Sequence, residues 1–295
     1  MDDFFLTNLE LRDSTETGEV ASGLSHASMK GMFLLAVLEL AARGEPRGAV
    51  TIVHDAGDTG SRYKDLALAL AADGWAIALP DLRGHGQTEG DRGHSTGLTE
   101  VRRDLQEIQD HLAYRMPEEP KVLVGQGLGA LYAACFALEQ KGALAAVVMV
   151  SPLHEPRFQR PEAPGGLKKL FGKKLGPRSA GAIGWKGDQL TRNAGRAEAW
   201  ESDPLTHDVI TLRTIEEAEA AARETLSRLG DAGIPVLIVH GDADPISDVE
   251  RSRALAGDGI DIEVFEGMRH HPLQEEGCEE VHARIVSWLD ARLPR

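Results

Sequence analysis

The segment 121–135, KVLVGQGLGALYAAC, constrains the fold of this chain more than any other stretch. Its apolar start predicts a short buried strand, the glycines at 125, 127 and 129 predict a tight turn, and the alanine-rich run that follows predicts a helix. Gly125 and Gly129 allow the helix to approach the strand closely, and Gly127 tolerates a strained backbone. The segment therefore predicts a strand that reverses directly into a helix.

The same alternation of strand and helix continues on both sides of this segment. Strands are expected at 4–11, 32–38, 49–53, 75–79, 121–125, 145–150, 235–240 and 260–265, and helices at 63–72, 98–114, 216–229, 249–255 and 279–293. On periodicity alone, 32–38 fits a helix as well. Strands that alternate with helices of this length form parallel sheets with right-handed crossovers. We expect an α/β fold: a mostly parallel central sheet flanked by helices, with an antiparallel hairpin of the first two strands at its edge.

The alternation stops between residues 154 and 203, a region rich in Pro, Gly and Lys. An interruption of that size between two runs of α/β units is typical of an insertion that covers a site. We therefore expect a single domain made of residues 1–153 as the N-terminal part of the core, 154–203 as a cap, and 204–295 as the C-terminal part of the core.

Composition excludes several classes of partner and location. The net charge of −15 disfavours nucleic acid and anionic membranes as main partners. The first residues lack the basic and apolar regions of a signal peptide, and the longest apolar run, 32–38, is too short to span a bilayer. Two distant cysteines make no disulfide framework, and Cys135 is expected in the core. We expect a cytoplasmic protein without an integral membrane segment; the sequence predicts no oligomeric state.

Polar loops follow the strands at the edge where a parallel sheet binds ligands. His54 and Asp55 follow the first core strand, and residues 81–86 follow the next. Asp244 stands after one late strand and His270 after the last. A turn at 127, then an acid, then a histidine is the chain order of nucleophile, acid and base in one large class of hydrolases.

Several ordered motifs carry a family resemblance. They are Arg62-Tyr63, D-x-R-G-H-G at 81–86, G-x-G-x-G at 125–129, Asp203-Pro204-Leu205, H-G-x-x-D ending at Asp244, and G-M-R-H ending at His270. Over roughly residues 25–293 the chain resembles the monoacylglycerol lipase and lysophospholipase branch of the α/β-hydrolases, also called serine aminopeptidase-like hydrolases. The resemblance implies a small acyl or ester-like ligand and no cofactor.

The resemblance also implies roles for individual residues. Asp244 matches the acid of a catalytic triad, in preference to Asp242, and His270 matches the general base. The backbone N–H groups of Ala56 and Leu128 match the donors that stabilise an oxyanion. Gln126 stands where the family usually has a histidine, and we expect it to pack under the turn.

Two departures from the family concern the reaction itself. The nucleophilic serine of G-x-S-x-G is replaced by Gly127, and the family's His-Gly before the oxyanion turn is His54-Asp55. If Asp55 faces inward, its carboxylate repels the negative charge that ester hydrolysis develops. Alternatively it faces outward or pairs with Arg62.

Other polar residues near the site have simpler interpretations. A metal site built from His271 with His54, Asp55 and Asp58 is conceivable, but adjacent histidines in a strand-end loop are expected to point in different directions, so we expect no metal. His85 and His94 are expected to be structural, hydrogen-bonded groups, and Ser95 and Ser151 are not placed to replace the missing serine.

The basic segment 165–178 carries Leu167, Leu170, Phe171 and Leu175 at helical spacing. It has three interpretations: a cap helix that lines an acyl pocket, as the resemblance implies; a contact with a membrane or anionic head group; or a solvated loop.

Three functional hypotheses follow. The chain is a catalytically degenerate member that keeps an acyl or ester-like ligand pocket; or it uses the pair His270 and Asp244 as a general base without a covalent acyl intermediate; or it is a serine hydrolase in which the serine was replaced to give Gly127.

Overall fold

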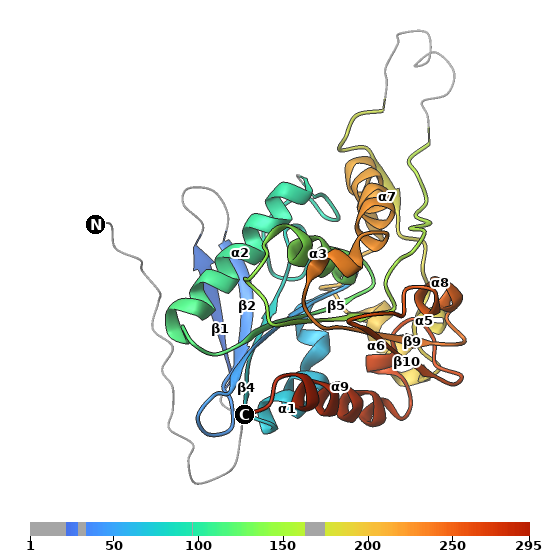
Figure 1. Ribbon diagram of the computed structural model, residues 1–295. Coiled ribbons are helices and arrows are strands. Elements are labelled where there is room, and N and C mark those ends of the chain that lie inside the picture. The colour runs from blue at the N-terminus through green and yellow to red at the C-terminus, as the bar shows by residue number, and fades with distance from the viewer. Residues whose placement is uncertain (1–21, 29–33, 96, 163–174) are drawn as a thin grey trace, which may run out of the picture.

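The computed structural model describes residues 22–28, 34–95, 97–162 and 175–295 (Figure 1). The strands are β1 (Ser22–Ser28), β2 (Leu34–Leu40), β3 (Gly48–Val53), β4 (Trp75–Pro80), β5 (Lys121–Gln126), β6 (Ala146–Val150), β7 (Ala180–Ala182), β8 (Val209–Thr211), β9 (Val236–Gly241) and β10 (Ile260–Phe265). The helices are α1 (Lys64–Ala72), α2 (Leu98–Arg115), α3 (Leu128–Glu139), α5 (Gly187–Leu190), α6 (Ala194–Ser202), α7 (Leu212–Leu226), α8 (Val249–Arg253) and α9 (Cys278–Arg292).

Eight of these strands form one sheet in the order β1-β2-β4-β3-β5-β6-β9-β10. The pairs from β4 to β10 are parallel, and β2 pairs antiparallel with both β1 and β4. The prediction of a mostly parallel sheet is confirmed, and an antiparallel hairpin lies at its edge. The first strand of this hairpin is Ser22–Ser28 and not the expected 4–11. The strand expected at 4–11 lies outside the described residues, and the antiparallel partner of β2 is β1.

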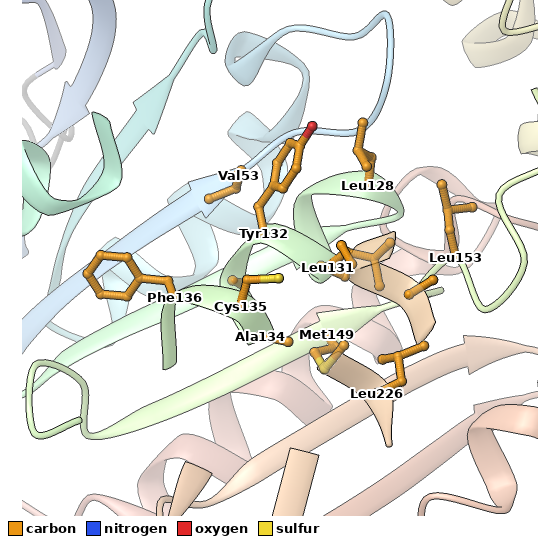
Figure 2. Close-up of a cluster of buried hydrophobic side chains, with 14 of the residues drawn as sticks. Val53, Leu128, Leu131, Tyr132, Ala134, Cys135, Phe136, Met149, Leu153 and Leu226 are labelled. Carbon is orange, nitrogen blue, oxygen red and sulfur yellow. The ribbon is translucent and has the colours of Figure 1, made fainter. Parts of the chain in front are cut away.

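Helices cover both faces of the sheet (Figure 1). As drawn, α2, α3 and α7 lie above it, and α1 and α9 lie below it. The helix α3 is buried along almost its whole length, from Leu128 to Leu138. Figure 2 shows side chains of this helix gathered with Met149 of β6 and Leu226 of α7. Cys135 belongs to this core, as expected, and its Sγ lies 2.8 Å from the Oγ1 of Thr225.

The chain between β6 and β9 leaves the main sheet before it returns. This part contains the two-stranded sheet of β7 and β8, the helices α5 and α6, and α7, which packs on α3. The helix expected at 216–229 is α7 and begins four residues earlier, directly after β8. The cap limits at 154 and 203 stay a prediction, and Leu167, Leu170 and Phe171 lie outside the described residues.

The order of the strands positions the site. Because β5 lies between β3 and β6, the loops that follow these strands meet at one edge of the sheet, and the loops after β9 and β10 adjoin them. Within the described residues, no helix is both long and apolar enough to cross a lipid bilayer.

Candidate functional site

The turn after β5 has the geometry that its three glycines predict. Gly127 adopts φ 52° and ψ −109°, and its N–H donates to the carbonyl of Val150 at 2.9 Å. A Cβ on Gly125 would lie 2.3 Å from the carbonyl oxygen of Gly129, and one on Gly129 would lie 2.4 Å from that of Val53. Only glycine fits these two flanking positions, since no side chain can occupy space already filled by backbone.

Asp55 faces inward, toward Gly127. It follows β3 and is almost fully buried, with 1% exposure. A Cβ on Gly127 would lie 2.2 Å from the carboxylate carbon of Asp55 and from both of its oxygens. The carboxylate of Asp55 therefore fills the space that a side chain at position 127 would need.

The alternative in which Asp55 pairs with Arg62 is wrong. Arg62 instead binds Asp58 through its Nε at 2.6 Å and Asp203 through its Nη2 at 2.8 Å. Tyr63 donates its hydroxyl to Asp58 at 3.1 Å. The charge of Arg62 is therefore paired with Asp58 and Asp203. The carboxylate of Asp55 contacts the turn at Gly127 instead.

The two N–H groups that the resemblance marks as oxyanion donors converge on one oxygen of Asp55. Its Oδ1 accepts from the N–H of Ala56 at 2.7 Å and from that of Leu128 at 2.8 Å. The donors are thus arranged around a common point, and the point holds a negatively charged oxygen from the chain itself. Their role in stabilising a reaction intermediate stays a prediction.

The other oxygen of Asp55 meets two histidines. Its Oδ2 lies 3.1 Å from the Nε2 of His270 and 3.2 Å from the Nε2 of His271. The expectation that these adjacent histidines point in different directions is wrong. The backbone bends at His271, with φ −108° and ψ 72°, just before a 3-10 turn at Pro272–Gln274, and this bend brings both rings to the same side.

Behind His270 stands Asp244. The Nδ1 of His270 lies 2.8 Å from the Oδ2 of Asp244. The Nε2 of His240 lies 3.0 Å from the same oxygen. Its Oδ1 accepts from the N–H groups of Ile246 and Ser247 at 2.7 and 3.0 Å. Asp242 instead accepts the N–H of Gly267 at 2.5 Å. The structure thus brings Asp244 to His270, and Asp242 lies outside the cluster.

These contacts shift the pKa values of Asp55, Asp244 and His270 strongly. Burial alone would raise the pKa of Asp55, but hydrogen bonds and attraction from His270 and His271 hold it well below its usual range. Burial acts likewise on Asp244, whose pKa is lowered instead by the charge of His270 and by hydrogen bonds from His240 and His270. Burial opposes charge on His270, yet Asp244 and Asp55 raise its pKa to about 10. At neutral pH, His270 is therefore an imidazolium held between two carboxylates.

Residues between β6 and β9 lie over this cluster. The ring of Trp185 stands edge-on to that of His270, with centroids 5.2 Å apart. The backbone N–H of His207 donates to the carbonyl of Gly57 at 3.0 Å, and a Cβ on Gly57 would lie 2.5 Å from Cδ1 of Ile183. Residues between β6 and β9 therefore pack against His270 and the Asp55 turn, and the charged groups are buried.

Gln126 and His54 support the cluster from below. The side-chain amide of Gln126 donates to the carbonyl of His270 at 2.8 Å, which agrees with the expected packing under the turn. The Nε2 of His54 accepts the N–H of Leu82 at 2.9 Å, so its Nδ1 carries the proton and donates to the carbonyl of Asp55 at 2.7 Å. His54 positions the Asp55 turn and does not reach the carboxylate cluster.

The remaining candidates take structural positions. His85 contacts the carbonyl of Arg83 at 3.0 Å, and His94 contacts the hydroxyl of Thr211 at 2.9 Å. Ser95 contacts Glu217 at 3.0 Å. Ser151 is fully buried at the end of β6. The structure therefore groups Asp55, His270, His271 and Asp244 and leaves these residues outside the group.

The fold and the strand–turn–helix at Gly127 define the class of protein as an α/β-hydrolase. The family model "Serine aminopeptidase, S33" matches residues 44–277, and the chain belongs to this family. The chain is 27% identical to the monoglyceride lipase of Homo sapiens, over 84% of each chain. It is 25% identical to the monoacylglycerol lipase of Mycolicibacterium smegmatis, over 84% of this chain and 90% of the relative.

Solved structures agree with this assignment. The monoacylglycerol lipase of Paleococcus ferrophilus superposes with a TM-score of 0.75 at 27% identity, over 88% of this chain and 99% of the other. A soluble variant of the monoglyceride lipase of Saccharomyces cerevisiae, in complex with a substrate analogue, superposes with a TM-score of 0.79 at 18% identity, over 95% and 98% of the two chains. The second comparison shows the shared fold.

Sequence reasoning missed His240 and Trp185, and it expected His271 to point away from His270. His271 shares the oxygen of Asp55, His240 shares that of Asp244, and Trp185 packs on His270. The H-G-x-x-D motif contains His240, and its position four residues before Asp244 was an available signal. The sequence gives no signal for the contact of Trp185 or for the orientation of His271, because both depend on contacts between distant segments.

Proposed function

We propose that this chain is a monoacylglycerol lipase-like protein that does not hydrolyse esters by serine-type acyl transfer and that binds a small acyl or ester-like ligand beneath its cap. The observation that carries the proposal is the Asp55 carboxylate on the N–H groups of Ala56 and Leu128. Ester hydrolysis needs those donors for the oxygen of its intermediate, and a fixed negative charge there repels that oxygen.

The missing nucleophile also disfavours ester hydrolysis. Gly127 has no side chain to attack a carbonyl, and loss of a serine nucleophile typically lowers turnover by about a million-fold. Asp55 and Gly127 also fit each other, since the carboxylate occupies the space beside the glycine. This fit disfavours the hypothesis of a serine hydrolase altered at position 127 alone, because restoring the serine would create a clash.

The ligand part of the proposal rests on the family. The relatives are lipases of monoacylglycerols, and the structure from Saccharomyces cerevisiae holds a substrate analogue. Trp185, which lies in the segment that we expect to form the cap, packs against His270 at the edge of the sheet where ligands bind. An acyl ligand in a cytoplasmic protein remains our expectation for this chain.

The second candidate function uses His270 with Asp244 as a general base without a covalent acyl intermediate. The observation in its favour is their intact contact at 2.8 Å. However, the pKa of about 10 keeps His270 protonated at neutral pH, where it donates hydrogen bonds and does not accept a proton. The base would become available only after Asp55 left its place, so we prefer the first function.

Turnover of p-nitrophenyl butyrate and octanoate tests the proposal with four proteins. The unaltered chain should be inactive. Gly127→Ser alone should be inactive as well, because the Asp55 carboxylate still blocks the serine and the oxyanion donors. Asp55→Gly with Gly127→Ser should hydrolyse at least about 100-fold faster than either, since both donors become free.

Adding His270→Ala to the double variant serves as the control and should abolish the gained activity. Activity of the unaltered chain would contradict the proposed role of Asp55. Equal activity of Gly127→Ser and of Asp55→Gly with Gly127→Ser would contradict it as well. The ligand part is tested separately by calorimetry of the unaltered chain with a non-hydrolysable 1-O-alkylglycerol. Absence of binding there would overturn the ligand assignment and leave the reaction argument intact.

A further inference from the structure

Three potential metal ligands converge at the centre of the site. One possible ligand atom from each of Asp55, His270 and His271 lies within 4.8 Å of the others. All three side chains are buried, with exposures of 1%, 0% and 3%. They come from two distant loops, after β3 and after β10, so the chain folds to bring them together.

The spacing of these atoms suits a metal ion. Zinc binds histidine nitrogen and carboxylate oxygen at about 2.0–2.2 Å, which places neighbouring ligands of a tetrahedral site about 3.4 Å apart. The Oδ2 of Asp55 lies 3.1 Å from one Nε2 and 3.2 Å from the other. Each of these two oxygen–nitrogen distances would need to lengthen by only about 0.2–0.3 Å to reach this spacing.

The supporting contacts resemble those of known metal sites. A metal-bound histidine usually donates its second ring nitrogen to a carboxylate, which fixes the ring and raises its basicity. His270 has this partner, since its Nδ1 lies 2.8 Å from Asp244. The Oδ1 of Asp55 is held by two backbone N–H groups, so its Oδ2 keeps a fixed direction.

Charge balance gives a further reason. Asp55 and Asp244 bring two negative charges into the buried cluster, and the ion pairs that the structure gives for them are all with histidines. A divalent cation would balance both of these charges and so lower the cost of burying the cluster.

We propose that Asp55, His270 and His271 form a binding site for a divalent transition-metal cation, with a fourth position for water or a ligand atom. Two imidazoles and one carboxylate select ions of the zinc, iron and cobalt type over calcium or magnesium. Such a site goes beyond the acyl-binding function proposed above and does not depend on it.

The test uses zinc and cobalt with the full chain. After treatment with EDTA and dialysis, the unaltered chain should bind one equivalent of Zn²⁺, measured by mass spectrometry of metal content after gel filtration. Co²⁺ should produce the visible absorption bands of a low-coordinate site with nitrogen ligands. His271→Gln should lower the affinity for Zn²⁺ by at least about 100-fold, since even an outer partner typically contributes 10–100-fold.

A matched control separates this site from other histidines. His94→Gln changes a buried histidine outside the cluster and should retain one equivalent. Asp244→Asn should weaken binding by about 10–100-fold without abolishing it, as an outer partner of His270. The proposal is overturned if the unaltered chain binds no Zn²⁺ and gives no Co²⁺ bands, or if His271→Gln binds as tightly as His94→Gln.

Discussion

The close fit between Gly127 and Asp55 predicts a large coupling between these two positions. In Gly127→Ala the new Cβ would lie 2.2 Å from the carboxylate carbon of Asp55. The methyl group at φ 52° adds backbone strain of about 1–3 kcal/mol. The carboxylate must also move from two backbone N–H groups, and hydrogen bonds to a charged group contribute about 1.5–3 kcal/mol each.

We therefore expect Gly127→Ala to lower the free energy of unfolding by about 3–5 kcal/mol, with part of the lost bonding regained by relaxation. In the Asp55→Gly background the clash disappears, and the same change should cost only the strain of about 1–3 kcal/mol. Urea unfolding of the unaltered chain, Gly127→Ala, Asp55→Gly and the double variant, with EDTA present, measures the cost of Gly127→Ala in each background.

Gly142→Ala provides the matched control, because Gly142 has φ 86° and nothing within 4 Å of its added Cβ. That change should report backbone strain alone. The reasoning would be refuted if the effects of Gly127→Ala and Asp55→Gly were additive within about 0.5 kcal/mol, as for independent sites.

Two further predictions concern stability. Burial and the nearby His240 lower the pKa of His154 to about 4 from 6.5, so the unfolded chain takes up the proton first as the pH falls from 6.5 to 4. His154 therefore stabilises the fold above pH 6.5 and loses this contribution toward pH 4. The loss in the free energy of unfolding is at most about 3 kcal/mol, and screening by solvent makes it smaller. Urea unfolding of His154→Gln should show a shallower decline over that window, and parallel curves would contradict the prediction. Glu275, buried to 1%, accepts the N–H groups of Arg192 and Arg269 at 3.0 and 2.9 Å; Glu275→Ala should cost about 2–4 kcal/mol in the same assay, and a change below about 0.5 kcal/mol would refute its anchoring role.

Most of the sheet was predictable because its signals are local. Buried parallel strands read as short apolar runs, and glycines or prolines mark their ends. The strand expected at 75–79 is β4 (Trp75–Pro80), and the final helix expected at 279–293 is α9 (Cys278–Arg292). The start of α7 was misplaced because its first turn carries no clear apolar periodicity, and the end of β8 sets its position.

The arrangement of the site was only partly predictable. The resemblance identified His270 and Asp244, which the structure brings within 2.8 Å. The direction of Asp55 could not be derived, since it depends on the approach of the β3 turn to the β5 turn across the sheet. The convergence of His271 depends on the bend before Pro272, which no periodicity reveals.

The central claim is that Asp55 occupies the place of the nucleophile and its oxyanion site. Labelling with a fluorophosphonate, followed by mass measurement of the intact protein, tests it directly, because the reagent reacts only with a serine that has a base and free oxyanion donors. We predict no adduct on the unaltered chain or on Gly127→Ser, and one adduct at position 127 in the Asp55→Gly, Gly127→Ser variant. Labelling of Gly127→Ser as fast as the double variant would contradict the claim.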